Sequence, residues 1–118
     1  MSKHSCIAFE GTAPISDRWT FNIDGRERAV MVKPRIVVNA GTAALDAALQ
    51  GFGVLRALSY QVDRLVKQRK LVVLLERFEP APVPVQLIQL PGRPNRAASA
   101  LVEFAAERLR ARLASGSL

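Results

Sequence analysis

Histidine and cysteine are almost absent from this chain: His4 and Cys6 are the only ones among its 118 residues. A lone cysteine cannot form an internal disulfide, and one histidine with one cysteine does not supply the several ligands that a metal site requires. A Ser-His-acid arrangement would depend on the same histidine, which lies too near the N-terminus to be held in a fixed geometry. The sequence therefore predicts no metal site and no catalytic residues, and we do not expect an enzyme.

Glycine-rich phosphate-binding motifs are absent as well. The chain contains neither G-x-G-x-x-G after a strand nor G-x-x-x-x-G-K. Close packing of a helix on a strand explains the glycines in Gly51-Phe52-Gly53 better than a nucleotide-binding loop does. The sequence therefore predicts no cofactor.

Long hydrophobic runs are also missing. No apolar run approaches the roughly 20 residues that span a membrane. The first residues, MSKHSCIAF, lack the long apolar region of a signal peptide. We therefore expect a cytoplasmic chain with no membrane partner.

Aromatic residues are few, and this bears on how the positive charge is interpreted. Aromatics make up 6% of a chain whose formal net charge is +7. The lysines and arginines are scattered, and they cluster only at residues 64–70 and 108–112. Proteins that bind single-stranded nucleic acids interleave basic residues with aromatic rings, so this pattern favours solvated helix faces. A small basic nucleic-acid-binding domain remains the less favoured alternative.

The order of apolar and turn residues predicts a single α/β domain. Cys6 to Phe9 is a short apolar run typical of a buried strand, and from Arg18 apolar and polar residues alternate as in a half-buried strand. Asp24-Gly25 is a favoured hairpin turn, so Arg28 to Lys33 is expected to return as the partner strand. Pro34 interrupts this ladder, so the chain is expected to bend or change neighbour there.

The stretch from Arg35 to Gly53 predicts a strand, a tight turn and a helix, and it is the main candidate for a binding site. In open α/β sheets, ligands bind beyond the carboxyl ends of the strands, where the next helix points unpaired N–H groups at them. Thr42 is predicted as the helix N-cap, and with Gly41 it would leave backbone donors accessible to an anion. The same pattern also fits a capped strand-helix unit without a ligand.

Further elements are expected in the second half of the chain. Apolar runs predict strands at Val54 to Leu58, Leu71 to Leu75 and Val85 to Leu90, and apolar residues at helical spacing predict helices at Gln61 to Gln68 and Arg96 to Ala114. Three closely spaced prolines in EPAPVPV predict an extended connector. One stripe of the last helix is apolar, so that helix is expected to pack on another surface.

The order of these motifs resembles the second half of the effector-binding domain of LysR-type transcriptional regulators. The resemblance covers nearly the whole chain, in CIAFEG, WTFNIDGRERAVMVKPRIVVNAGTAALDAALQGFGV, VDRLVKQRKLVVLLERF and VPVQLIQLPGRPNRAASALVEFAAERLRARL. Its most specific parts are a W-x-F strand before a D-G hairpin, a V-N turn into an A-A-L-x-G-x-G helix, and P-x-R before a helix that contains phenylalanine. The segment from Lys67 to Lys70 departs from the family, which usually has a glycine there.

The resemblance implies an α/β fold like that of type II periplasmic binding proteins, with two lobes and a small-molecule effector between them. Residues 8–83 would form the second lobe, a mixed sheet flanked by helices. Residues 84–118 would be a return strand and a terminal helix that belong to the first lobe, so the two-lobe domain would be incomplete. The helix-turn-helix through which family members bind DNA is not expected in this chain.

Carried over by position, the resemblance also implies an effector-binding site. The candidates are Phe9, Glu10 and Gly11 where the chain crosses between lobes, and Asn39, Ala40, Gly41 and Thr42 at the turn. The helix-terminus argument and the resemblance thus point to the same turn. Because the other wall of the cleft would be missing, we expect this chain alone to bind an effector weakly or not at all.

The terminal helix gives a reason to expect a homo-oligomer. Burial of its five larger apolar side chains is worth roughly 8 to 15 kcal/mol in total, so such a stripe is not expected to stay in water. The five side chains are those of Leu101, Val102, Phe104, Leu109 and Leu113. We expect residues 85–113 to swap or pair with those of another copy.

Two functions follow from the resemblance. The first is the effector-sensing and oligomerisation portion of a LysR-type regulator, in which the chain is a truncated product or a fragment. The second is a stand-alone truncated protein that pairs with full-length regulators and interferes with their assembly.

Overall fold

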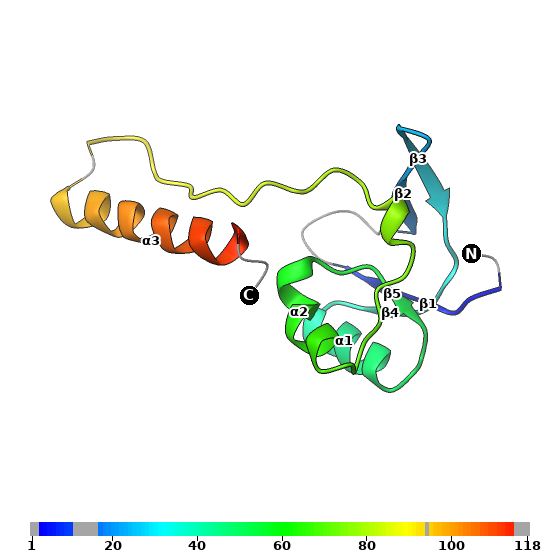
Figure 1. The fold of residues 1–118 in the computed structure, drawn as a ribbon. Helices are drawn as coiled ribbons and strands as arrows, with labels where there is room; N and C mark the ends of the chain where they lie inside the picture. The colour runs from blue at the N-terminus through cyan, green and yellow to red at the C-terminus, as the bar shows by residue number, and fades with distance from the viewer. Residues whose placement is uncertain (1–2, 11–16, 94, 115–118) are drawn as a thin grey trace. The chain divides into compact units, whose positions relative to one another are not determined.

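The computed structural model describes residues 3–10, 17–93 and 95–114. The chain forms two compact units, Met1–Ala81 and Pro82–Leu118, and each is described here by itself (Figure 1). This division lies close to the expected boundary between residues 83 and 84. The assignment of the two parts to different lobes stays a prediction.

A three-stranded parallel sheet forms the centre of the first unit. Its order is β4 (Pro34–Val38), β1 (Cys6–Phe9) and β5 (Val54–Leu55). Cys6, Ile7 and Ala8 are all buried, because β1 has a strand on each side and a helix against it. The short apolar run at the N-terminal end thus forms the central strand, as its composition predicts.

Helix α1 (Gly41–Leu49) connects β4 to β5 and lies against all three strands of this sheet (Figure 1). Ala44 is its buried residue, and a side chain this small allows the helix to approach the strands closely. The predicted strand, turn and helix between Arg35 and Gly53 are therefore confirmed. The expected strand after Gly53 is also present, but it is shorter than predicted and ends at Leu55.

A hairpin forms a second, separate sheet from β2 (Arg18–Ile23) and β3 (Arg26–Met31). Asp24 has φ 53° and Gly25 has φ 76°, the two positive values that a type I′ turn requires. The predicted hairpin is therefore confirmed. The chain then changes sheets, since β4 begins at Pro34 and pairs with β1.

The prediction of one mixed sheet is wrong for the described residues, in which a parallel sheet and an antiparallel hairpin are distinct. Side-chain packing connects the two sheets. Trp19 of the hairpin is 3% exposed and packs with Cys6 of β1 and Val32 in one buried cluster. The hydrophobic core of the first unit therefore lies where the hairpin meets the parallel sheet.

Helix α2 (Ser59–Lys67) and the short 3₁₀ helix η1 (Glu76–Phe78) complete the first unit. None of the residues of α2 is buried. Its C-terminal turn has Arg69 at φ 58°, with Arg69 N–H donating to the Val66 carbonyl and Lys70 N–H donating to the Leu65 carbonyl, both at 2.9 Å. This is a Schellman motif with arginine at the position where glycine is preferred.

The predicted strand from Leu71 to Leu75 is not formed. Val72 is 79% exposed, and Leu75 has φ 56°, a left-handed conformation that does not continue a strand. A strand is stable only when its backbone pairs with a neighbour, and none of the described strands pairs with this run. The apolar composition of residues 71–75 is therefore not sufficient to place this run in a sheet.

The second unit contains helix α3 (Arg96–Ala114), with the bounds that the sequence predicts. Asn95 caps this helix, because its side-chain oxygen accepts a hydrogen bond from the Ala98 N–H at 2.7 Å. The predicted strand from Val85 to Leu90 is not formed, since no described strand lies beside it to complete a ladder. No residue of α3 is buried.

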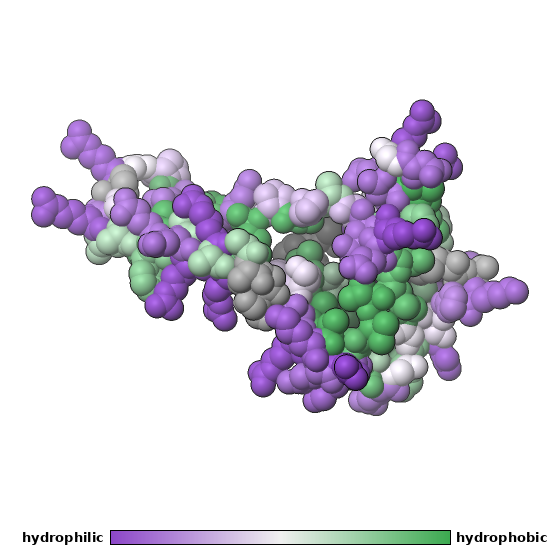
Figure 2. Space-filling view, in the orientation of Figure 1, coloured by the Kyte–Doolittle hydropathy of each residue, from purple (hydrophilic) through white to green (hydrophobic). Residues whose placement is uncertain are grey.

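Apolar side chains therefore remain at the surface of this chain, and the green areas of Figure 2 mark those on the face shown. The larger exposed ones include Val72, Leu74, Ile88, Leu90, Leu101 and Phe104. Within the described part of the chain, no helix has both the length and the hydropathy that crossing a membrane requires.

Candidate functional site

The carboxyl ends of β1 and β4 lie side by side. The two strands are parallel, with Phe9 opposite Val38, and the N–H of Glu10 donates to the Val38 carbonyl at 2.8 Å. The chain leaves β1 through Glu10 and leaves β4 through Asn39 and Ala40. Two groups of residues that are far apart in sequence, the crossover and the turn, therefore meet at one edge of the sheet.

Helix α1 begins at this edge, and its first turn has free backbone donors. The N-cap is Ala40, whose backbone is extended at φ −126° and ψ 129°, and no side chain caps the helix. The first amide with an intrahelical partner is that of Ala44, which donates to the Ala40 carbonyl at 3.1 Å. The amides of Gly41, Thr42 and Ala43 precede it and point beyond the helix end.

The prediction that Thr42 is the N-cap is therefore wrong. The N-cap is Ala40, two residues before Thr42, so Thr42 lies inside the first turn, where it is exposed. Because alanine has no side-chain acceptor, the free amides are not satisfied by a cap. The first turn also contains no acidic residue, so no side chain of that turn would repel an anion.

Gln61 is a neighbour of this turn that sequence reasoning missed. Its side-chain oxygen accepts a hydrogen bond from the Leu58 N–H at 3.1 Å, which orients the amide group at the start of α2. Its Nε2 atom lies 3.8 Å from the point where a Cβ on Gly41 would stand. The only signal in the sequence was that α2 follows the carboxyl end of a third parallel strand, β5.

The predicted effector-binding residues differ in accessibility. Phe9 and Gly41 are half-buried, whereas the others with a described position are exposed, namely Glu10, Asn39, Ala40 and Thr42. Gly11 lies outside the described residues. Apart from Gly11, the structure brings the crossover residues and the turn residues to one edge. Their role in binding stays a prediction.

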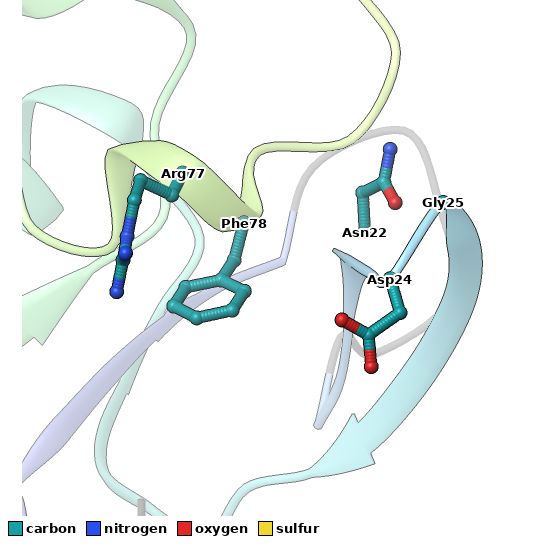
Figure 3. A pocket seen from close by; sticks show the side chains of 5 residues that line it. All are labelled: Asn22, Asp24, Gly25, Arg77 and Phe78. Atoms are coloured by element: carbon teal, nitrogen blue, oxygen red, sulfur yellow. The ribbon is translucent and has the colours of Figure 1, made fainter.

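A second concave region lies between the hairpin tip and η1. Asn22, Asp24, Gly25, Arg77 and Phe78 line a hollow of about 520 Å³ (Figure 3). The Arg77 guanidinium stacks on the Phe78 ring, 5.6 Å from its centroid, and in Figure 3 the ring lies between Arg77 and the Asp24 carboxylate. None of the predicted effector-binding residues lines this hollow.

Metal binding has no support in this geometry. The described residues, 3–10, 17–93 and 95–114, include no group of three or more His, Cys, Asp and Glu side chains that could hold a metal ion. Cys6 is a buried residue of the central strand. The chemistry that the candidate edge can supply is therefore hydrogen bonding from backbone amides.

Comparisons with known proteins agree with the resemblance to LysR-type regulators. The family model described as the LysR substrate binding domain matches residues 1–110. The HTH-type transcriptional regulator PgrR of Escherichia coli (strain K12) is 32% identical over 69 residues, which is 58% of this chain and 23% of PgrR. The chain thus spans about a quarter of the length of that regulator. No solved structure matches the chain significantly.

A second relative is similar over more of its length. YagP of Escherichia coli (strain K12), named as a LysR family substrate binding domain-containing protein, is 30% identical over 107 residues. The match covers 88% of this chain and 78% of YagP. Because the family model covers nearly all of the chain, the chain belongs to the LysR substrate-binding domain family.

Proposed function

We propose that this chain is the effector-sensing and oligomerisation portion of a LysR-type transcriptional regulator, with a small molecule bound in the interlobe cleft of the intact protein. In this proposal residues 8–83 form the second lobe, and residues 84–118 belong to the first lobe. In this proposal the chain acts in the cytoplasm, and a helix-turn-helix of the intact regulator reads the DNA.

One observation supports the proposed site most strongly. The free amides of Gly41, Thr42 and Ala43 lie at the carboxyl edge of the parallel sheet, beside the crossover at Phe9 and Glu10. A helix N-terminus attracts an anion through unpaired N–H groups and the helix dipole. The site is therefore suited to a small molecule with a carboxylate or another anionic group. Gln61 would add a side-chain amide donor.

A thermal-shift screen tests this proposal. The chain is heated with small carboxylates, each paired with its neutral amide, such as acetate with acetamide and benzoate with benzamide. We expect at least one carboxylate to raise the melting temperature at millimolar concentration while its amide does not, because only the native state holds the amides of α1 in one place. Equal shifts for both members of every pair would contradict an anion site.

A second function is favoured by the match with YagP. The aligned region covers most of both chains. In YagP, therefore, the region that matches this chain makes up most of the protein. This supports a stand-alone interaction protein that pairs with full-length LysR-type regulators. Its exposed apolar segments would then bind a regulator subunit.

The native size of the protein distinguishes these two functions. An antibody raised against residues 98–113 is used to detect the product in cells of the source organism. A band much larger than 12.9 kDa would show that the chain is part of a longer regulator. A band at 12.9 kDa that co-purifies with a full-length LysR-type regulator would support the stand-alone function.

A further inference from the structure

The hollow between the hairpin tip and η1 has a size that suits a small molecule. Its volume is about 520 Å³, and ligand pockets typically range from about 300 to 1,000 Å³. One wall is the end of the hairpin, with Asn22, Asp24 and Gly25, and the other is η1, with Arg77 and Phe78 (Figure 3). Both walls belong to the first unit, so one compact part of the chain supplies the whole hollow.

The wall formed by η1 depends on a strained residue. Leu75 adopts φ 56° and ψ 32° directly before η1, and its carbonyl accepts a hydrogen bond from the Phe78 N–H at 2.8 Å. A left-handed backbone is unfavourable for leucine, and the Leu75 side chain is 47% exposed, so burial does little to offset that cost. Strain of this kind is concentrated at functional sites, and here it comes directly before the turn that carries Arg77 and Phe78.

The two walls carry opposite charges that do not neutralise one another. Asp24 lies on the hairpin side and Arg77 on the η1 side, and the Phe78 ring lies between them (Figure 3). In the described part of the chain, neither Asp24 nor Arg77 forms an ion pair. Asn22 adds a side-chain amide on the same side as Asp24. The hollow therefore offers an acceptor wall and a donor wall, each with its charge available.

Arg77 is oriented without losing its capacity for hydrogen bonding. Its guanidinium stacks over the Phe78 ring, with Cζ 5.6 Å from the ring centroid. A guanidinium that stacks through its face keeps its in-plane N–H groups free, and these can bind a carboxylate through two parallel hydrogen bonds. The phenylalanine ring thus holds the cation in place and also offers apolar surface to a ligand.

A ligand with a single charge does not suit these walls. An anion attracted to Arg77 is repelled by Asp24, and a cation attracted to Asp24 is repelled by Arg77. A molecule that carries both charges is attracted at each end. Because the Phe78 ring separates the two groups, the charges of such a molecule have to lie at opposite ends of an apolar body.

We propose that this hollow binds a small zwitterion of the ω-amino-acid type. Its ammonium group is held by the side-chain oxygens of Asp24 and Asn22, its carboxylate by Arg77, and its apolar body lies against Phe78. Asp24 and Arg77 are exposed, so solvent screening keeps each ion pair weak, and we expect a dissociation constant in the millimolar range. The inference is independent of the proposed function, because none of these residues belongs to the candidate edge at the start of α1.

Titration of the complete ¹⁵N-labelled chain with 4-(aminomethyl)benzoate tests the proposal. This probe carries an ammonium group and a carboxylate at opposite ends of an aromatic ring, whereas benzylamine and benzoate each lack one of the two groups. We expect the zwitterion to shift the amide signals of residues 22–25 and 77–78, and to bind there about fivefold or more tightly than either single-charge probe. Equal affinities for the three probes, or no shift at these residues at about 20 mM zwitterion, would overturn the proposal.

Two variants remove the charges of the walls one at a time. Asn-Gly favours the same hairpin turn as Asp-Gly, so Asp24→Asn should stay folded, which Trp19 fluorescence checks. We expect 4-(aminomethyl)benzoate to bind Asp24→Asn no more tightly than benzoate does, and to bind Arg77→Gln no more tightly than benzylamine does. The control is Asp46→Asn, the same change at an exposed position of α1, which should leave the affinity for the zwitterion unchanged.

The position of the shifts separates this inference from the proposed function. Shifts only at residues 39–43 would show that the zwitterion binds through its carboxylate at the start of α1, and the proposal for the hollow would be wrong. An unchanged affinity of the hollow in Asp24→Asn would also overturn it, because binding would then not depend on the carboxylate. Shifts at the hollow without any at residues 39–43 would support the inference and leave the effector site to be judged by the thermal-shift screen.

Discussion

The N–H of Glu10 donates to the carbonyl of Val38 at 2.8 Å, so the ends of β1 and β4 leave the parallel sheet as neighbours. One of these residues lies at the crossover and the other immediately before the turn into α1. This hydrogen bond fixes the edge at which the uncapped helix begins. The proposed site depends on that edge more than on any single side chain.

A negative charge in the first turn of α1 should abolish anion binding. Gly41→Asp places a carboxylate at the helix start, where it interacts favourably with the free amides and repels an incoming anion. A Cβ at this position meets only Gln61 Nε2, at 3.8 Å, so the substitution fits without overlap. We expect the carboxylate-dependent thermal shift to disappear. Ala29→Asp, an equal charge change at an exposed position of β3, should keep it.

Arg69 and Gly51 occupy the same position in two helix ends, and they should respond oppositely to substitution. Gly51 has φ 80° and ends α1, whereas Arg69 has φ 58° and ends α2. Because a left-handed backbone is unfavourable for a residue with a Cβ, Arg69→Gly should stabilise the first unit by about 0.5 kcal/mol, and Gly51→Ala should destabilise it by about 1 kcal/mol. Urea unfolding followed by Trp19 fluorescence measures both. A loss of stability in Arg69→Gly would show that the arginine side chain makes contacts that outweigh the backbone effect.

Gly53 should tolerate no side chain. A Cβ at this position would overlap the carbonyl of Ser5, to which the Val54 N–H donates at 2.8 Å. Since backbone cannot move aside as a flexible side chain can, Gly53→Ala should lower the free energy of unfolding by about 3 kcal/mol.

The control for this substitution is Gly25→Ala. Gly25 also has a positive φ, but a Cβ there would meet nothing within 4 Å. It should therefore cost only the backbone strain, about 1 kcal/mol. Equal losses in the two variants would mean that the close approach of Gly53 to Ser5 is not a constraint.

Helix α3 should depend on its N-cap, because none of its residues is buried. Asn95→Ala removes the acceptor for the Ala98 N–H and should cost the helix about 1 kcal/mol. Circular dichroism at 222 nm should then show less helix and an earlier melt. Asn95→Asp retains an acceptor and should keep the native signal; a loss of helix in that variant would contradict the capping role.

Elements with strong local signals could be predicted from the sequence. Asp24-Gly25 specifies a hairpin through its own backbone preferences. The apolar spacing of residues 96–114 predicts a helix and the positions of both its ends. The Arg35 to Gly53 unit was also predictable, because a β-branched run, a turn and an alanine-rich segment follow one another.

The two strands that were predicted but are not formed had no comparable local signal. Leu71 to Leu75 and Val85 to Leu90 are apolar and β-prone, but a strand also needs a neighbouring edge to pair with. Whether such an edge exists is a property of the whole assembly and is not encoded in the segment.

The candidate site was predicted in position but not in detail. The resemblance and the helix-terminus argument both led to the turn at Asn39 to Thr42. The N-cap was misplaced because threonine is a better cap than alanine, whereas the strand end fixes the helix start. Gln61 was missed because its closeness to Gly41 depends on the orientation of α2, which spacing along the chain does not reveal.

Amide chemical shifts of the ¹⁵N-labelled chain test the central claim most directly. The chain is titrated with the carboxylate that gives the largest thermal shift, and in parallel with its neutral amide. The account predicts that only the carboxylate moves signals and that the largest changes fall on Glu10 and on the amides of residues 39–43, with Gly41→Asp abolishing them. Changes centred on the hollow at Asn22 and Phe78 would contradict an effector site at the start of α1.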